Sequence, residues 1–371
     1  MKTVLITGSQ GFIGGYLCRE LLSNGYRVIG LDNYSKYGRV KRDYDTHKNF
    51  KLRDFDLAER WAMEGLDNKL AAWKVDYIIA GAAMIGGISY FHKYAYDLLA
   101  TNERITANTF DAAIKAFERG PLERIVSISS SMVYEGADTE RDKIDDMASV
   151  SCCGPGNFRD PESVWPSQES DVGILPSPNS TYGFQKLATE YFCKGAQEQY
   201  GLPYTIVRPF NCVGIGEDKA LGEETVYSGN VKLQMSHVLP DIVNKILRGQ
   251  DPLHILGDGN QIRCYTHGKD IARGIRLAME SEDAINEDFN ISTSRETTVL
   301  ELAEIVWNRI HTGRKSFRVV NDTPFTYDVQ KRVPDVKKAF DKFGFTARIS
   351  LEESVDEVVT HMEAQRESNS A

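Results

Sequence analysis

Short apolar runs alternate with longer amphipathic segments along the first third of the chain. The predicted strands occupy residues 4–7, 27–31, 50–53, 75–80 and 124–128. The predicted helices between them occupy residues 12–22, 57–73 and 97–117. Buried strands that alternate with helices are typical of a parallel sheet with helices on both faces. The pattern therefore predicts an α/β fold with a Rossmann-type doubly wound parallel sheet.

The alternation continues less regularly towards the C-terminus and predicts a smaller α/β substrate domain. Helices are predicted from Ser180 or Thr181 onward and at residues 231–247, 266–279, 298–310 and 351–362. Short strands are predicted at residues 253–256, around Arg263 and at residues 289–292. We expect residues 1–211 and about 266–291 to form the Rossmann domain. Residues 212–265 and 292–371 would form the second domain.

Three glycines follow the first predicted strand with the spacing G-x-x-G-x-x-G: Gly8, Gly11 and Gly14. Gly8 permits a tight turn, Gly11 lets a ligand approach the backbone, and Gly14 lets the following helix pack closely on the strand. That helix opens at Phe12 and Ile13, and its positive end and backbone N–H groups would face a diphosphate. The turn predicts a dinucleotide site, with a purely structural βαβ turn as the alternative.

The second predicted strand ends at Asp32, eighteen residues after Gly14. A carboxylate there can accept hydrogen bonds from both hydroxyls of an adenosine ribose and would repel a 2′-phosphate. NAD is therefore favoured over NADP as the cofactor. Four basic residues that follow could restore NADP binding: Lys36, Arg39, Lys41 and Arg42.

Further cofactor contacts are expected at the carboxyl edge of the sheet, where the ligands of open α/β sheets bind. The residues expected there are Asn33, Asp56, Leu57 and Ala82. Asp56 could meet the adenine amino group or cap the helix that follows, and both interpretations stay open.

Tyr182 and Lys186 lie four residues apart, on one face of a predicted helix. An ammonium near a phenol favours the phenolate, which lowers the pKa of the phenol and makes it a usable general base. Taken alone, the spacing fits a surface pair equally well. The serine cluster at residues 129–131 and the dinucleotide turn favour the catalytic interpretation.

Residues 135–180 lack periodicity and are rich in Asp, Ser, Pro and Gly. A connection of this length inside a compact domain is usually a functional lid or a disordered insertion. Because the segment lies between the serine cluster and Tyr182, we favour a substrate-covering role over a passive insertion.

The charge balance narrows the possible partners. The chain has 44 Lys and Arg against 53 Asp and Glu, a formal net charge of −9, and no basic tract. Neither nucleic acid nor an anionic membrane would be attracted by such a surface. The six cysteines have neither disulfide nor zinc spacing, so no metal site is predicted. Without a signal peptide or a membrane-spanning run, a reducing cytoplasm is the expected compartment.

Several motifs occur together in the chain: T-G-x-x-G-F-I-G from Thr7, the serine cluster before Val133-Tyr134, Y-G-x-x-K from Tyr182, Arg208-Pro209-Phe210-Asn211, and Gly257-Asp258-Gly259-Asn260-Gln261-Ile262-Arg263. As a set they resemble the extended short-chain dehydrogenase/reductase superfamily, and within it the NAD-dependent nucleotide-sugar epimerase and dehydratase branch. The resemblance extends from residue 4 to about residue 359.

The resemblance implies a role for each matching residue. Ser130 matches the catalytic hydroxyl, Tyr182 the catalytic base, and Lys186 the residue that binds the nicotinamide ribose. Substrate-binding positions are Gly87, Ser131, Met132, Asn211, Lys219, Arg263 and Arg332. Among these, Asn211 would meet the phosphates of the sugar nucleotide, and the two arginines would pair with its diphosphate. The resemblance also implies a homodimer through the helix at 97–117 and the helix that carries Tyr182.

The implied chemistry is transient oxidation of the sugar at C4, after which the hydride returns to the other face, so that NAD acts as a catalyst. Related 4,6-dehydratases carry an Asp-Glu pair where this chain has Ser131 and Met132. The stretch from Ala82 to Ile88 is similar to GDP-mannose 3,5-epimerases and GDP-fucose synthases, which carry a catalytic cysteine where Met132 stands. A thioether cannot move a proton, so both of these reactions are disfavoured.

A 4-epimerase therefore ranks first. A 3,5-epimerase of the GDP-mannose type, a nucleotide-sugar reductase and a decarboxylase are the alternatives. A 3,5-epimerase would need a substitute acid, for which Lys219 is the best placed, although this residue could equally be a solvated loop lysine. From another class, a non-catalytic dinucleotide-sensing regulator stays open, although such relatives lose the Tyr or the Lys that this chain keeps.

Overall fold

The computed structural model describes residues 1–59, 62–85, 94–137, 165–217, 226–228, 231–233, 237–323 and 329–370. A seven-stranded sheet in the order β13-β6-β5-β4-β1-β2-β3 forms its centre. All neighbouring strands in this sheet are parallel. The strands are β1 (Thr3–Thr7), β2 (Arg27–Asp32), β3 (Phe50–Asp54), β4 (Tyr77–Ala80), β5 (Arg124–Ile128), β6 (Tyr204–Pro209) and β13 (Glu287–Ile291). The predicted Rossmann-type parallel sheet is confirmed.

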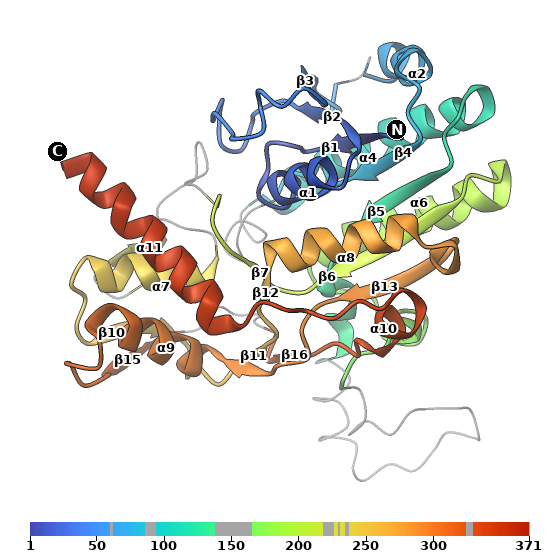
Figure 1. Ribbon diagram of the computed structural model, residues 1–371. Helices are drawn as coiled ribbons and strands as arrows, with labels where there is room; N and C mark the ends of the chain where they lie inside the picture. The colour runs from blue at the N-terminus through green and yellow to red at the C-terminus, as the bar shows by residue number, and fades with distance from the viewer. Residues whose placement is uncertain are drawn as a thin grey trace, which may run out of the picture.

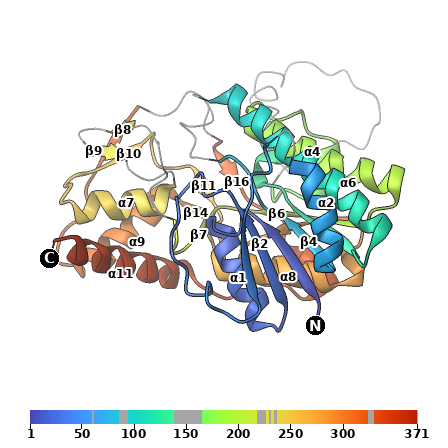
Figure 2. The ribbon, with the colours of Figure 1, turned by 90° about the horizontal axis from the view of Figure 1, so that it is seen from above.

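Helices cover both faces of the sheet (Figure 1, Figure 2). On one face α1 (Phe12–Ser23) packs beside α8 (Gly268–Glu280), and on the other α4 (Ala95–Arg119) lies between α2 (Ala62–Trp73) and α6 (Thr181–Tyr200). Successive residues of β1 point to opposite faces: Val4 and Ile6 join the core beneath α1 and α8, and Leu5 joins the core beneath α2 and α4. Burial on both faces explains why the central strands are continuous apolar runs.

The C-terminal part has a core of its own, beside the large sheet (Figure 1). It is formed by α7 (Val238–Leu247), α9 (Val299–His311) and α11 (Leu351–Ser370) with the parallel pair β10 (Leu253–Leu256) and β15 (Val319–Asp322). A small sheet, β14 (Thr297–Thr298), β11 (Ile262–Arg263) and β16 (Lys331–Arg332), lies next to it. In contrast, α10 (Lys337–Phe343) packs against β13 of the large sheet. The division into two domains at the expected boundaries stays a prediction.

Several predicted helix boundaries are wrong. The helix predicted at 231–247 begins at Val238, because Pro240 fits only the first turn, where no intrahelical hydrogen bond is lost. Residues Val231–Leu233 form β9 instead, antiparallel to β8 (Val226–Ser228). The helix predicted at 57–73 begins at Ala62, because the carboxylate of Asp56 holds a turn at residues 57–59. The helix predicted at 266–279 begins at Gly268, because β12 (Thr266–His267) pairs with β7 (Cys212–Val213).

The two ends of the aperiodic region 135–180 are joined in the structure. Oε2 of Glu135 accepts hydrogen bonds from the backbone N–H of Ser180 at 2.9 Å and from its hydroxyl at 2.7 Å. Residues 165–173, which we call the return arm, pair with the segment after β16. Residues 138–164 lie outside the described residues, so the substrate-covering role stays a prediction. Among the described helices, none combines the length and apolarity needed to cross a membrane.

Candidate functional site

The glycine turn after β1 has the geometry expected of a diphosphate cradle. Gly8 has a φ of +73°, which glycine adopts without strain, and its N–H donates to the carbonyl of Leu31 at 2.8 Å. A Cβ on Gly14 would lie 2.0 Å from the carbonyl oxygen of Gly8, so only glycine fits there. The N-cap of α1 is Gly11, which has no side chain to cap the first N–H groups of the helix. Those N–H groups, from Phe12 and Ile13 onward, suit an anion.

Asp32 ends β2 beside this turn. Its Oδ2 accepts from the backbone N–H of Gln10 and its Oδ1 from that of Tyr34, both at 2.8 Å. Burial raises the pKa of the Asp32 carboxyl, and these two N–H donors partly offset that shift. Each carboxylate oxygen can accept more than one hydrogen bond, so the hydroxyls of a ribose can still bind. The residues present therefore fit NAD.

The basic residues considered for NADP are largely engaged elsewhere. Arg39 pairs with Asp54 and lies over the ring of Tyr34, 4.2 Å from its centroid. Lys36 lies 5.0 Å from the centroid of the Tyr37 ring. Arg42 donates from Nη2 to the carbonyl of Gln10 at 2.8 Å, next to Asp32. Lys41 is exposed. This arrangement favours NAD.

The remaining cofactor candidates lie along the same edge. Nδ2 of Asn33 donates to Oδ2 of Asp56 at 2.9 Å, and Oδ1 of Asp56 accepts from the N–H of Ala58 at 2.8 Å. Because α2 begins at Ala62, Asp56 is not its N-cap, and that alternative is wrong. The adenine contact stays a prediction. Leu57 is buried in the core beneath α2, and the N–H of Ala82 donates to Oγ1 of Thr7 at 3.0 Å.

The catalytic candidates meet at the carboxyl end of β5. Ser130 is the N-cap of the short 3₁₀ helix η1 (Ser131–Tyr134), and its side chain hydrogen-bonds to the buried Tyr182. Nζ of Lys186 donates to the carbonyl of Ile128 at 2.9 Å and lies 5.9 Å from the centroid of the Tyr182 ring. Thr7, Ala82 and Lys186 line one small cavity, so the lysine lies next to the strand that leads into the glycine turn.

Local sequence explains how α6 presents these groups. Ser180 is its N-cap and accepts from the N–H of Gly183 at 3.0 Å, as the predicted cap position requires. A Cβ on Gly183 would lie 2.8 Å from the carbonyl oxygen of Met132 and 2.9 Å from Oε2 of Glu135. Glycine beside Tyr182 therefore lets the first turn of α6 approach η1 closely enough for Ser130 and Tyr182 to meet.

Burial controls the proton affinities of the two titratable groups. It raises the pKa of Tyr182 to about 12, although the hydrogen bond from Ser130 and the charge of Arg332 act in the opposite direction. Burial lowers the pKa of Lys186 to about 8, and the nearby Glu190 partly offsets this. A cation close to the phenol, from bound ligand or from lysine, is the factor that favours its phenolate.

Two arginines of the substrate side are paired positions of one sheet. Arg263 on β11 is opposite Arg332 on β16, so their side chains leave the same face of the sheet. Arg263 is buried, and its Nη1 donates to the carbonyls of Ile262 and Gln330. Arg332 extends to η1, where its Nη1 contacts Sδ of Met132 at 3.1 Å.

The structure brings these two arginines to one region, but only Arg332 contacts the catalytic group. Ser131 and Met132 are buried within η1, and Met132 shares an apolar cluster with Tyr182. Nδ2 of Asn211 is buried and has no hydrogen-bond partner among the described residues. Gly87 and Lys219 lie outside the described residues, and their roles stay predictions. Of the other acids considered as substitutes for Lys219, Glu217 is paired with His237.

Sequence reasoning assigned no role to two buried residues at the back of this site, Glu190 and Arg208. Glu190 lies four residues after Lys186, a spacing that places both on one face of α6 and could have identified it. Asn102 of α4 was noted without a role, and it clamps Met84 by accepting from its N–H at 2.6 Å and donating to its carbonyl at 2.9 Å. Among the described residues, no cluster of three or more His, Cys, Asp or Glu side chains could hold a metal ion.

Comparisons with known proteins bear on this site. A model of the NAD dependent epimerase/dehydratase family matches residues 4–292. The UDP-N-acetyl-alpha-D-glucosaminuronate decarboxylase of Bacillus cytotoxicus is 27% identical over 361 residues, 96% of this chain and 97% of the relative. A putative UDP-glucose 4-epimerase of Methanocaldococcus jannaschii is 27% identical over 362 residues, 97% of this chain and 98% of the relative.

A solved structure is similar over nearly the whole chain. The UDP-glucose 4-epimerase of Thermotoga maritima, crystallised with UDP-glucose, superposes with a TM-score of 0.75 at 26% identity. The alignment covers 98% of this chain and 99% of that protein.

Proposed function

The chain belongs to the NAD dependent epimerase/dehydratase family, as its motifs predicted, and from this premise we propose that it is a nucleotide-sugar 4-epimerase. The two similar proteins named as UDP-glucose 4-epimerases support this proposal. When bound, NAD supplies a hydride acceptor that can return the hydride to the sugar. The proton transfers must then come from residues of the chain itself.

The observation that carries the proposal is the meeting of Tyr182, Ser130 and Lys186 beside the glycine turn. Tyr182 would take the proton of the C4 hydroxyl, directly or through Ser130, while the Lys186 ammonium stabilises the phenolate. The same groups would return the proton after the sugar has presented its other face. This reaction needs no further acid or base, and the thioether at Met132 offers none.

The small sheet supplies plausible contacts to the nucleotide diphosphate. A guanidinium fork matches two phosphate oxygens, so Arg263 and Arg332 on one face suit that group. The unpartnered amide of Asn211 is a further candidate donor. We assign the nucleotide sugar to the space between these residues and Tyr182, with the C-terminal part as the substrate domain.

Decarboxylation is a second candidate, because one similar protein is named as a nucleotide-sugar acid decarboxylase. If the substrate carried a carboxylate on C5, oxidation at C4 would place a ketone β to that carboxylate. Such β-keto acids lose CO₂ readily. The first step would then use the same Tyr182 and NAD as the epimerase, and only the substrate would decide the outcome.

Incubation in deuterated water with UDP-glucose, UDP-N-acetylglucosamine or UDP-glucuronic acid tests the proposal by ¹H NMR. We expect conversion to the C4 epimer without deuterium on any sugar carbon, because the hydride returns without exchange. Deuterium at C3 or C5 would establish a 3,5-type epimerase and contradict the proposal. Release of CO₂ from the uronic acid would establish the decarboxylase.

We also propose a homodimer through α4 and α6, which lie side by side (Figure 2). Large aromatic side chains are exposed on both helices: Tyr96 at 77%, Phe184 at 48% and Tyr191 at 65% of their surface. A second copy packed by the same face would bury them. Light scattering of the protein and of Tyr191→Glu tests this, and a monomeric starting protein would contradict it.

A further inference from the structure

A buried ion pair lies behind the catalytic residues. Glu190 on α6 and Arg208 on β6 are both fully buried. Nε and Nη2 of Arg208 donate to Oε1 and Oε2 of Glu190 at 2.8 and 2.7 Å, the two-pronged geometry that is strongest for this pair. Desolvation of two charges usually cancels much of such a gain, so a buried pair is weak evidence for a role in stability. Its position suggests another role.

Glu190 touches the catalytic residues from two sides. Oε1 accepts a hydrogen bond from the hydroxyl of Ser129 at 2.6 Å, and Ser129 immediately precedes Ser130. On its own helix, Glu190 lies one turn after Lys186 and acts on it electrostatically. One carboxylate therefore contacts the end of β5 and also opposes the charge of the catalytic lysine.

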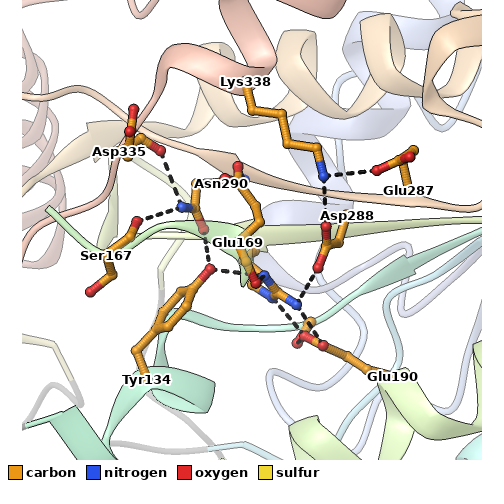
Figure 3. A network of polar contacts seen from close by, with 11 residues as sticks. Tyr134, Ser167, Glu169, Glu190, Glu287, Asp288, Asn290, Asp335 and Lys338 are labelled. Carbon is orange, nitrogen blue, oxygen red and sulfur yellow. Dashed lines mark hydrogen bonds and ion pairs between the residues drawn. The ribbon is translucent and has the colours of Figure 1, made fainter. Parts of the chain in front are cut away.

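Arg208 extends the contact to the remaining elements of the site. Figure 3 shows Tyr134, Glu169, Glu190 and Asp288 converging on the centre of this network. Nη1 of Arg208 donates to the hydroxyl of Tyr134 at 2.8 Å and to the carbonyl of Glu169 at 3.2 Å, and its Nη2 donates to Asp288 at 2.7 Å. Tyr134 belongs to η1, Asp288 to β13 and Glu169 to the return arm.

The return arm continues the network to β16. Asn290 donates from Nδ2 to the carbonyls of Ser167 and Asp335 at 3.0 and 3.1 Å (Figure 3). The N–H of Ser167 donates to the carbonyl of Val333 at 2.8 Å, directly after Arg332. The segments that carry Ser130, Tyr182 with Lys186, and Arg332 thus all join one buried network with Glu190 and Arg208 at its centre.

The charges around Lys186 are few. On its own helix, Glu190 is the acid and Tyr182 the other titratable group. The cavity wall that β1, β4, β5 and α4 build against Lys186 consists of uncharged residues in the described part of the chain. On β6, Arg208 lies behind Glu190, and on β16, Arg332 acts on Tyr182. Glu190 is therefore the negative charge that retains the proton on Lys186, and it also screens Lys186 from Arg208.

We propose that Glu190, held by Arg208, is a positioning residue for catalysis that aligns Ser129 and Ser130 with Tyr182 and keeps Lys186 cationic. This proposal rests on the roles proposed above for Ser130, Tyr182 and Lys186. Glu190 does not touch the reacting atoms and acts only through its neighbours.

Glu190→Gln tests the charge, because glutamine keeps the shape and one acceptor. We expect kcat at pH 7 to fall at least about tenfold while KM for the nucleotide sugar stays within about twofold. The acidic limb of the kcat profile should move to higher pH by about one unit, because a less cationic lysine stabilises the phenolate less. Glu198→Gln, on the exposed side of α6, is the matched control and should behave as the wild type.

Two further measurements do not depend on that kinetic profile. In protein labelled with ε-¹³C lysine, the Lys186 signal, identified by its loss in Lys186→Arg, should titrate at lower pH in Glu190→Gln. Ser129→Ala removes only the hydroxyl contact, so we expect kcat to fall about threefold, by loss of one hydrogen bond, with the acidic limb unmoved. This milder variant keeps the proposal testable if Glu190→Gln does not fold.

The outcomes separate the inference from the proposed function. A Tyr182→Phe protein with near-normal kcat would refute the proposed function itself. An inactive Tyr182→Phe together with a Glu190→Gln protein of unchanged kcat, pH profile and lysine titration would overturn only the positioning role. A Ser129→Ala protein with wild-type kcat would do the same for the alignment of Ser130.

Discussion

The glycine turn and the catalytic pocket lie at the same edge of the sheet but are built in different ways. The turn, residues 8–14, is one short segment whose backbone forms the site, and its glycines leave no room for a Cβ. The pocket joins side chains from β5 and η1, from α6 and from β16, and its properties depend on burial and charge. The turn should therefore be sensitive to added volume, and the pocket to the loss of one hydroxyl or one charge.

The largest effect is expected from Tyr182→Phe in the pocket. Loss of the phenolic hydroxyl should lower kcat about 10³-fold, because proton transfer by a positioned base contributes on that order. Bound NAD, measured by release from denatured protein, should remain, because the glycine turn is unchanged. Tyr200→Phe at the exposed end of the same helix serves as the control. A kcat within tenfold of the wild type would contradict the assignment.

The second prediction concerns the proton on Lys186. Because its pKa is lowered from 10.5 to about 8 in the fold, the unfolded chain binds more protons between these values, and stability rises with pH across that window. Relative to Lys186→Met, the wild type should gain up to about 3 kcal/mol from pH 8 to pH 10.5. Urea unfolding of both proteins along this range measures the difference. A constant difference would show that the lysine is not titrating as a buried group.

The third prediction sets added volume in the turn against added volume elsewhere. A Cβ on Gly14 would lie 2.0 Å from the carbonyl of Gly8, so Gly14→Ala should destabilise the fold by about 2 kcal/mol and deplete bound NAD. Gly195→Ala in α6 meets nothing within 4 Å and should be neutral or stabilising by up to about 1 kcal/mol. Thermal unfolding and NAD content decide the comparison. Full NAD occupancy in Gly14→Ala would contradict the cradle.

The smallest effect should distinguish the two arginines of the small sheet. The charge of Arg332 lowers the pKa of Tyr182, so Arg332→Gln should reduce kcat about tenfold and move its acidic limb to higher pH. Arg263→Gln should raise KM about tenfold through loss of a charged hydrogen bond, with kcat unchanged. Steady-state kinetics between pH 6 and 9 separate the two. Identical changes in both variants would mean that the arginines act as one clamp.

Much of the fold was accessible because it depends on neighbouring residues. The burial of β1 on both faces and the N-cap at Ser180 are local features that the pattern predicted. Helix starts were less predictable. The helix assigned to residues 231–247 failed at its first turns, where a short strand pair competes with the helix and only a distant partner decides. Asp56 was undecided for the same reason, since its turn competes with the helix cap.

The sequence by itself determined the parallel sheet, the glycine turn with Asp32, and the identity of the residues that carry the chemistry, because periodicity and short spacings express local backbone preferences. Only the tertiary structure decided that Arg332 reaches Met132 and Tyr182, and that Glu190 and Arg208 join Ser129, η1 and the return arm. These contacts link residues far apart in the chain, and they form only when burial of the apolar faces brings their segments together.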